Sequence, residues 1–199
     1  SVIEADKERG IEHAATVVLV RPSRDGFEVF LVKRHHKSAF MGGAYVFPGG
    51  KLDTGDCYLQ SEFATDSVNT LAECLEPTPP NVQFEFSHAY GLVVAACREL
   101  FEESGVLLAQ TPLTRSDEFC EQLQEYRSKL NAGDIQFEDV LRLNQLQLEV
   151  DGLDYWAHWI TPSNEKRRFD TRFFVAEIPF TQTAKSDQSE TTDSKWLSP

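Results

Sequence analysis

Alternating hydrophobic and polar positions predict a β-hairpin near the start of the chain. ATVVLVRP (15–22) and FEVFLVKR (27–34) both carry the two-residue period of a strand, and the polar turn SRDG separates them. The stretch AYVFPGGKLDTGD (44–56) has the pattern of a short strand that breaks into a loop, because its adjacent glycines allow backbone conformations that other residues avoid. The first quarter of the chain is therefore predicted to be mainly β-structure.

The middle of the chain changes to the period of a helix. Residues 90–104 follow a helical pattern that ends at Gly105, a residue typical of a helix C-terminus. Two further helical stretches cover 116–131 and 137–146. Residues 57–89 are less regular, since they hold a candidate helix around SVNTLAECLE and then the proline-rich, irregular PTPPN.

The C-terminal third is predicted to return to strands. LDYWAHWITP (153–162) and TRFFVAEIPF (171–180) form a strand pair, and a polar loop (181–190) leads to a short final strand in SKWLSP (194–199). Helices and strands alternate irregularly, which favours a mixed α/β sandwich over an all-helical or all-β fold. The length favours a single domain over residues 1–199.

Composition and charge restrict the partners. The formal net charge of −13 argues against DNA and anionic membranes, which bind proteins through Lys and Arg. No apolar run approaches the roughly 18 residues of a membrane span, and the first residues are too charged for a signal peptide. The widely spaced cysteines form no CxxC pair, which favours reduced thiols and an intracellular location. The terminal Ser198-Pro199 resembles the start of a further helix, so we expect a truncated C-terminus.

The segment AACRELFEESGVLLA (95–109) gathers three glutamates on one side of a predicted helix. Glu99, Glu102 and Glu103 share an arc of about 100° on a helical wheel. A solvated acidic face is the ordinary outcome of such a cluster. However, like charges at this spacing repel, and the last turn is the unfavourable end of the helix dipole for anions. Bound Mg²⁺ or Mn²⁺ would relieve both penalties, because these ions prefer hard oxygen ligands.

The loop and the helix together resemble the signature of the Nudix hydrolase superfamily, G-x5-E-x7-R-E-U-x-E-E-x-G-U, in which U is a bulky aliphatic residue. Gly50 supplies the first glycine within PGGKLD, and RELFEESGV (98–106) matches the second half at every specified position. Asp56 stands where the first glutamate is expected, and the spacer 57–97 is 34 residues longer than the seven of the signature. The first glutamate is generally structural, so these departures put the bracing between loop and helix in doubt more than catalysis.

A signature interrupted at this point resembles the branch that contains the peroxisomal coenzyme A diphosphatases. The stretches VFPGG, HWITP and RRFDTRFF add to this resemblance. It implies a Nudix-type α/β/α sandwich with a mixed β-sheet and an insertion at about 57–89, between the catalytic loop and the catalytic helix. We expect this insertion to influence substrate preference. A cytoplasmic, peroxisomal or mitochondrial location is expected from the resemblance alone.

The resemblance also implies roles for individual residues. Glu99, Glu102 and Glu103 would hold the metal ion, with the Gly50 carbonyl as a further ligand, and Arg98 would orient a glutamate of the signature. Glu99 is the first candidate for the general base. The candidates outside the signature are a second acid from a late loop and three phosphate-contacting arginines, namely Glu190, Arg34, Arg167 and Arg168.

Several of these positions have an ordinary structural alternative. Glu190 lies in a polar run, and Arg167 and Arg168 lie in a charged loop, where solvent-facing side chains are common. Four strand aromatics could stack on an adenine base, although strand aromatics more often belong to a core. These four are Trp156, Trp159, Phe169 and Phe173.

The predicted activity is metal-dependent hydrolysis of the diphosphate linkage in a nucleoside diphosphate derivative. Coenzyme A or an acyl-CoA is the leading substrate, with release of 3′,5′-ADP and phosphopantetheine. The alternatives are hydrolysis of ADP-ribose, NADH or capped RNA, and a non-catalytic Nudix module that binds a nucleotide. We expect an enzyme, because non-enzymatic members usually lose glutamates that this sequence retains. The sequence leaves the oligomeric state open, a homodimer included.

Overall fold

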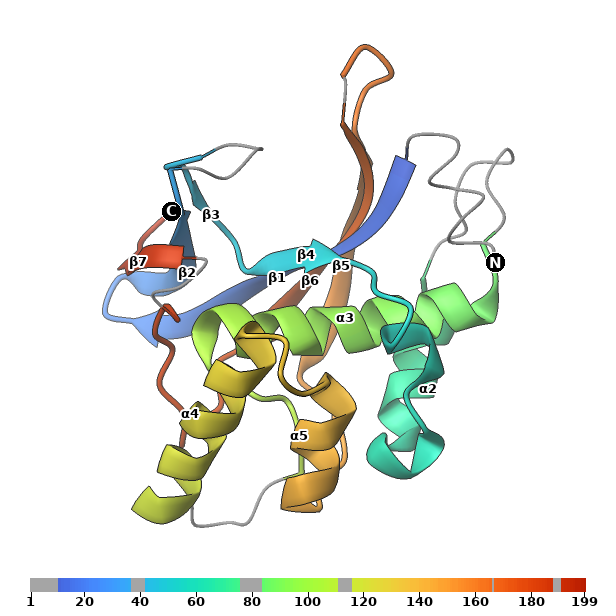
Figure 1. Cartoon of the computed structure of the whole chain (residues 1–199). Helices are drawn as coiled ribbons and strands as arrows, with labels where there is room; N and C mark the ends of the chain where they lie inside the picture. Colours follow the sequence, from blue (N-terminus) through green and yellow to red (C-terminus); the bar gives the residue numbers. More distant parts are fainter. Residues whose placement is uncertain (1–10, 37–41, 76–83, 111–115, 166, 188–190) are drawn as a thin grey trace.

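A single mixed sheet forms the centre of the protein (Figure 1). The structure is a computed structural model that describes residues 11–36, 42–75, 84–110, 116–165, 167–187 and 191–199. Within these residues the sheet has seven strands: β1 (Ile11–Ser23), β2 (Gly26–Arg34), β3 (Tyr45–Val46), β4 (Gly49–Lys51), β5 (Leu153–Ile160), β6 (Arg168–Glu177) and β7 (Thr191–Leu197).

The strand order is β3-β2-β1-β6-β5, with β4 paired to β1 and β7 paired to β2. β1 and β6 run parallel from the pair Ile11 and Arg168 to the pair Val20 and Glu177. The other strand pairs are antiparallel, which confirms the predicted N-terminal hairpin and the predicted C-terminal strand pair. β1 begins four residues before its predicted start, because its first half pairs with β4 on one side and β6 on the other.

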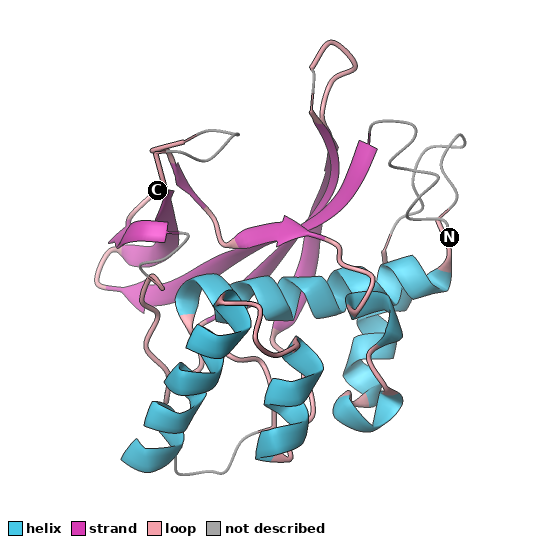
Figure 2. Ribbon diagram, viewed as in Figure 1, coloured by secondary structure: helices cyan, strands magenta, loops and turns pink. Residues whose placement is uncertain are grey.

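The described α-helices lie together on one side of the sheet (Figure 2). They are α2 (Asp66–Glu73), α3 (Phe86–Ser104), α4 (Asp117–Asn131) and α5 (Phe137–Asn144). α3 packs across β1 and β4, and the other three surround α3. The α/β class and the mixed sheet are confirmed, but the second helical layer of the expected α/β/α sandwich is not among the described residues. None of the described helices is long and apolar enough to cross a membrane.

The long helix α3 begins at Phe86, four residues before its predicted start at Tyr90. Its N-terminus is capped by Glu85 and His88, which form a reciprocal capping box, and the Glu85 N–H donates to His88 Nδ1 at 3.2 Å. This pair lies outside the usual Ser, Thr, Asp and Asn capping set, so the residue types did not indicate the helix start. The predicted end is confirmed, because Gly105 adopts a left-handed φ of 75° after the last turn.

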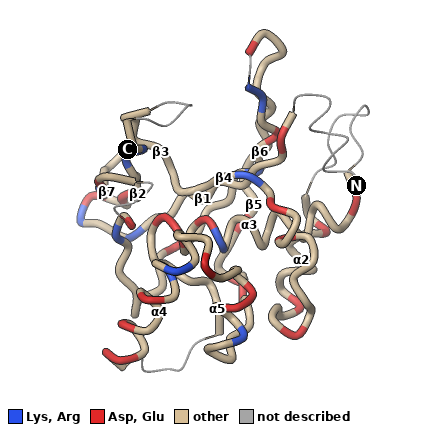
Figure 3. Tube along the Cα trace, viewed as in Figure 1, with Lys and Arg blue, Asp and Glu red and all other residues tan. Residues whose placement is uncertain are grey.

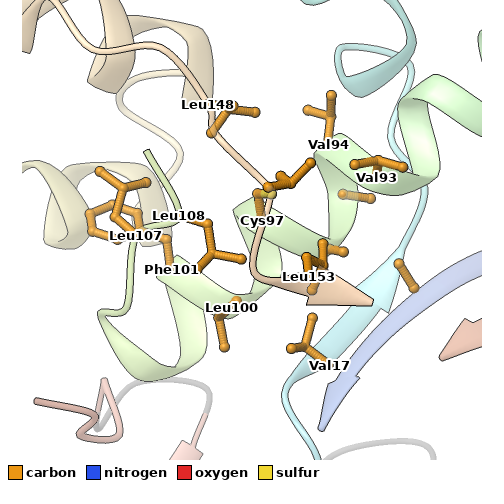
Figure 4. Packing of buried hydrophobic residues seen from close by; sticks show 14 of the residues in the cluster. Val17, Val93, Val94, Cys97, Leu100, Phe101, Leu107, Leu108, Leu148 and Leu153 are labelled. Carbon is orange, nitrogen blue, oxygen red and sulfur yellow. The ribbon is translucent and has the colours of Figure 1, made fainter. Parts of the chain in front are cut away.

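The hydrophobic core lies between α3 and the sheet (Figure 4). Val17 of β1, Cys97 and Leu100 of α3 and Leu148 before β5 are each fully buried. Burial of a side chain such as Leu100 contributes about 1.5–3 kcal/mol. Cys97 is a free thiol within this core, so it acts as a small apolar residue there.

The stretch between the glycine-rich loop and α3 packs into the same core. It contains two short 3-10 turns, η1 (Asp56–Tyr58) and η2 (Ser61–Phe63), followed by α2. Its backbone is bonded to a distant segment, since Thr65 N donates to Leu148 O at 2.9 Å and Leu148 N donates to Phe63 O at 2.8 Å. The described residues of this stretch, 57–75, therefore pack against the rest of the protein, although their status as an insertion stays a prediction.

Gly91 lets η1 approach α3 closely, which leads to a stability prediction. A Cβ at this position would lie 2.7 Å from Cys57 Sγ and 3.1 Å from Cys57 Cα. We expect Gly91→Val to lower the free energy of unfolding by about 1–3 kcal/mol, because overpacking displaces backbone. Thermal unfolding followed by circular dichroism measures the change. Gly152→Val is the control, since no heavy atom lies within 4 Å of that site, and equal losses in both variants would contradict the prediction.

Candidate functional site

Arg98 joins the glycine-rich loop to α3. Its Nε donates to Asp56 Oδ1 at 2.9 Å and its Nη2 donates to Asp56 Oδ2 at 3.0 Å, which is a bidentate ion pair between two buried residues. Nη2 also donates to Lys51 O at 2.9 Å, and the Asp53 N–H donates to Asp56 Oδ2 at 2.9 Å. The bracing between loop and helix is therefore present with Asp56 in place of glutamate.

The same guanidinium contacts two of the three glutamates. Arg98 Nη1 donates to Glu99 Oε1 at 2.8 Å and to Glu102 Oε2 at 3.0 Å. Burial opposes the charged form of Arg98, but the hydrogen bond to Asp56 and the nearby carboxylates raise its pKa overall. Burial, and then the negative charge of Glu99, raise the pKa of Glu102 to about 8. The carboxylates are thus crowded enough to favour a bound cation.

Glu103 lies apart from Arg98 and contacts the loop backbone, because the Gly49 N–H donates to Glu103 Oε2 at 3.0 Å. Gly49 itself passes very close to β1, where a Cβ would lie 2.4 Å from Ala15 O. Only a glycine fits there without displacing backbone. The loop therefore approaches the end of α3 closely enough for its N–H to hold a carboxylate.

Two hollows meet at Glu103. A small acidic pocket of about 230 Å³ is lined by Asp53, Arg98, Glu99, Glu102, Glu103, Leu130, Asn131 and Asp187. A larger cavity of about 1100 Å³ is also lined by Glu103, Gly50 and Thr16. In β1, Thr16 alternates with Val17 of the core, so the large cavity lies on the sheet face opposite α3.

The large cavity gathers several residues predicted from the sequence. Arg34, at the end of β2, and Arg167, just before β6, both line it. Three of the four strand aromatics line it too, which places them in a cavity wall and not in the core: Trp159, Phe169 and Phe173. The rings of Trp159 and Phe173 meet edge to face, with centroids 6.4 Å apart. Trp156 is 65% exposed.

Other predicted residues are placed elsewhere. Arg168 donates through Nε to Thr161 O at 3.1 Å and is not among the residues that line either hollow. Glu190 lies outside the described residues. Of the described part of 57–89, no residue lines the two hollows.

Asp187 and Asn131 line the acidic pocket but were not anticipated. Asp187 lies in a polar loop, and Asn131 is the last residue of α4. A polar residue in either setting is ordinary, so no pattern in the sequence distinguished them. Their position depends on how α4 and the loop meet in three dimensions.

The donor set of the acidic pocket fits a hard divalent cation, because Glu99, Glu102 and Glu103 offer carboxylate oxygens in an open pocket. Yet within the described ranges no three Asp, Glu, His or Cys side chains are arranged to hold a metal ion. Arg98 engages one oxygen of Glu99 and one of Glu102. Metal binding would therefore require the carboxylates to reorient.

The ion pair between Asp56 and Arg98 gives a second stability prediction. Breaking a buried pair costs about 3–5 kcal/mol, but Arg98 would keep Glu99 and Glu102 as partners. We therefore expect Asp56→Asn to lower the free energy of unfolding by about 2–3 kcal/mol, measured by urea denaturation. Asp53→Asn is the matched control, because its side chain is 72% exposed and 3.7 Å from Arg98. An Asp56→Asn variant as stable as this control would disprove the bracing role.

Comparison with known proteins agrees with this geometry. The family model described as the NUDT19 Nudix domain matches residues 11–199. Acyl-coenzyme A diphosphatase NUDT19 of Xenopus laevis is 28% identical over 207 residues, which cover 87% of this chain and 53% of the relative. The human protein of that name is 25% identical over 222 residues, covering 89% of this chain and 55% of the relative. The chain thus spans about half the length of the curated relatives it matches.

A solved structure supports the fold. A Nudix hydrolase from Alicyclobacillus acidocaldarius superposes with a TM-score of 0.66 at 24% identity, covering 94% of this chain and 78% of the other. The fold, the glutamates at the end of α3 and the match over residues 11–199 lead to one assignment. The chain belongs to the Nudix hydrolase superfamily, in the family defined by the NUDT19 Nudix domain.

Proposed function

We propose that the protein is a metal-dependent diphosphatase that hydrolyses coenzyme A or an acyl-CoA to 3′,5′-ADP and the corresponding phosphopantetheine. The observation that carries this proposal is the place of Glu103, where the acidic pocket meets the large cavity. A diphosphate bound at this junction would lie beside the three glutamates while its organic groups extend along the cavity. The curated relatives named as acyl-coenzyme A diphosphatases support the choice of substrate.

Glu99, Glu102 and Glu103 are the proposed ligands of Mg²⁺ or Mn²⁺, with the Gly50 carbonyl as a further ligand. Such an ion, when bound, would neutralise phosphate charge and make the attacking water more acidic. The loop backbone and Glu99 are already close together, because a Cβ on Gly50 would lie 2.3 Å from Glu99 Oε1. This proximity supports the proposal that the Glu99 carboxylate and the Gly50 carbonyl bind the same metal ion.

Glu99 is the proposed general base, which would accept a proton from the water that attacks phosphorus. Arg98 donates to one oxygen of this carboxylate at 2.8 Å, and this bond would limit how the carboxylate turns when a metal ion binds. Arg98 therefore acts through Glu99 and not on the substrate. Glu190 stays a prediction for a second acid, and the intracellular location expected from the sequence stays a prediction as well.

The large cavity supplies the proposed contacts to the rest of the substrate. Arg34 and Arg167 would bind phosphate oxygens through their guanidinium groups. Trp159 and Phe173 offer aromatic surface on which an adenine could stack. Arg168 would support the loop that carries Arg167, since its Nε bonds to Thr161 O.

The activity is tested by incubating the protein with CoA, acetyl-CoA, ADP-ribose, NADH and capped RNA, with Mg²⁺ or Mn²⁺. We expect the CoA compounds to be cleaved with the highest kcat/KM, and Glu103→Gln to lower kcat by about 100-fold or more. The control is Glu125→Gln, an exposed glutamate of α4 that pairs with Lys129.

Each other outcome contradicts a different part of the proposal. No turnover of any substrate with either metal would leave a nucleotide-binding module as the alternative. A preference for ADP-ribose, NADH or capped RNA would disprove the CoA assignment. Turnover that survives in Glu103→Gln would disprove its role as a metal ligand.

The cavity contacts give a prediction on substrate affinity. A hydrogen bond to a charged group contributes about 1.5–3 kcal/mol, so we expect Arg167→Ala to raise the KM for CoA by about 10-fold or more, with a smaller change in kcat. Steady-state kinetics at saturating Mg²⁺ measures both values. Arg24→Ala, in the exposed turn between β1 and β2, is the control. An unchanged KM would exclude Arg167 from the substrate site.

A further inference from the structure

The end of α3 that carries Glu102 and Glu103 is held by two side chains of α4. Arg127 donates from Nε to Glu102 O at 2.9 Å, and Asn131 donates from Nδ2 to the same oxygen at 3.2 Å. Arg127 is only 4% exposed. The carbonyl groups at a helix C-terminus carry partial negative charge, so this buried guanidinium offsets the unfavourable position of glutamates in the last turn. Figure 3 shows acidic and basic positions close together where α3 meets α4.

The same two side chains also hold the segment that precedes β7. Arg127 donates from Nη2 to Lys185 O at 3.0 Å, and Asn131 Nδ2 donates to Asp187 Oδ2 at 3.2 Å. The other oxygen of Asp187 accepts from the Thr191 N–H at 3.1 Å and from its hydroxyl at 2.5 Å. Asp187 is therefore fixed by three donors while it lines the acidic pocket.

This segment is also bonded directly to the end of α3 and the residues after it. The Lys185 N–H donates to Ser104 O at 2.8 Å. The side-chain amide of Gln182 exchanges two hydrogen bonds with the backbone of Leu107, both at 2.8 Å. The end of α3, the segment 182–187 and the last turns of α4 therefore form one connected wall of the pocket.

Charge distinguishes this arrangement from an ordinary helix cap. Burial lowers the pKa of Arg127, and the negative charges of Asp187 and Glu103 oppose that decrease. Arg127 is thus a buried cation whose charge interacts with those of Asp187 and Glu103. The contacts to Glu102 O would be enough to cap α3. The bond from Asn131 to Asp187 is additional, and it joins this cap to a fourth acidic side chain of the pocket.

We propose that Arg127 and Asn131 are positioning residues, which hold the backbone that carries Glu102 and Glu103, together with the Asp187 carboxylate, as one wall before a metal ion binds. The inference rests on the metal site of the proposed function. Asn131 links the backbone of Glu102 to the carboxylate of Asp187, so its loss frees the two to move apart. Arg127 keeps like-charged carboxylates together. Helix α4 contains no residue of the Nudix signature, yet it sets the affinity of the site for its metal.

The test measures Mn²⁺ binding by isothermal titration calorimetry without substrate, and amide hydrogen exchange of residues 182–187 without metal. The variants are Asn131→Ala, Asn131→Leu, which keeps a similar volume and loses the amide donor without adding a charge, and Arg127→Lys. We expect Mn²⁺ to bind 10–100-fold more weakly and the segment 182–187 to exchange faster. Ser128→Ala is the control on the same helix, because the exposed Ser128 donates its hydroxyl within α4, to Gln124 O at 3.0 Å, and the variant is expected to match the wild type.

The outcomes separate the possible failures. Folded Asn131 variants that bind Mn²⁺ within twofold of the wild type overturn the inference, as does weaker binding with unchanged exchange. If Asn131→Ala does not fold, the same two measurements on Asn131→Leu and Arg127→Lys decide. A wild-type protein that binds Mn²⁺ but cleaves no diphosphate disproves the proposed function and leaves this inference standing.

Discussion

The buried ion pair between Arg98 and Asp56 is the contact on which the site depends. It joins two residues 42 positions apart in the chain, and the same guanidinium holds Glu99 and Glu102. A buried ion pair loses the hydration of both partners and is stable only with good geometry and further hydrogen bonds. The bidentate contact and the backbone of Lys51 supply these. Aspartate can replace the longer glutamate because η1 begins at this residue and packs against α3.

Features that depend on local patterns were predictable from the sequence. The hairpin, the C-terminal strand pair and the end of α3 at Gly105 follow from periodicity and residue type. Features that depend on distant partners were not. Periodicity indicates which residues share a face, but not which strand lies next to it, so the parallel pairing of β1 with β6 was unforeseen. The start of α3 was misplaced because its cap uses Glu85 and His88.

The same distinction applies to the site. The spacing of three glutamates after Arg98 singled them out, because a fixed spacing on a helix determines a common face. Phe169 and Phe173 were candidates for stacking on a base, but their residue type could not tell a core from a cavity wall. Asn131 and Asp187 meet only because α4 and the segment that precedes β7 converge. The sequence around either residue does not indicate that the two lie close together.

The long spacer between the glycine-rich loop and Arg98 is compatible with an intact site, because closing the longer connection costs little additional free energy. Lengthening a connection from seven residues to 41 raises its closure cost by only about 1.5 kcal/mol, since the cost grows with the logarithm of length. Burial of Val68 alone, within this longer connection, offsets that amount. The described part of 57–89 packs on the helical side and lines neither hollow. These residues contact α3 and not the hollows, so the ion pair, not chain continuity, holds the loop beside the helix.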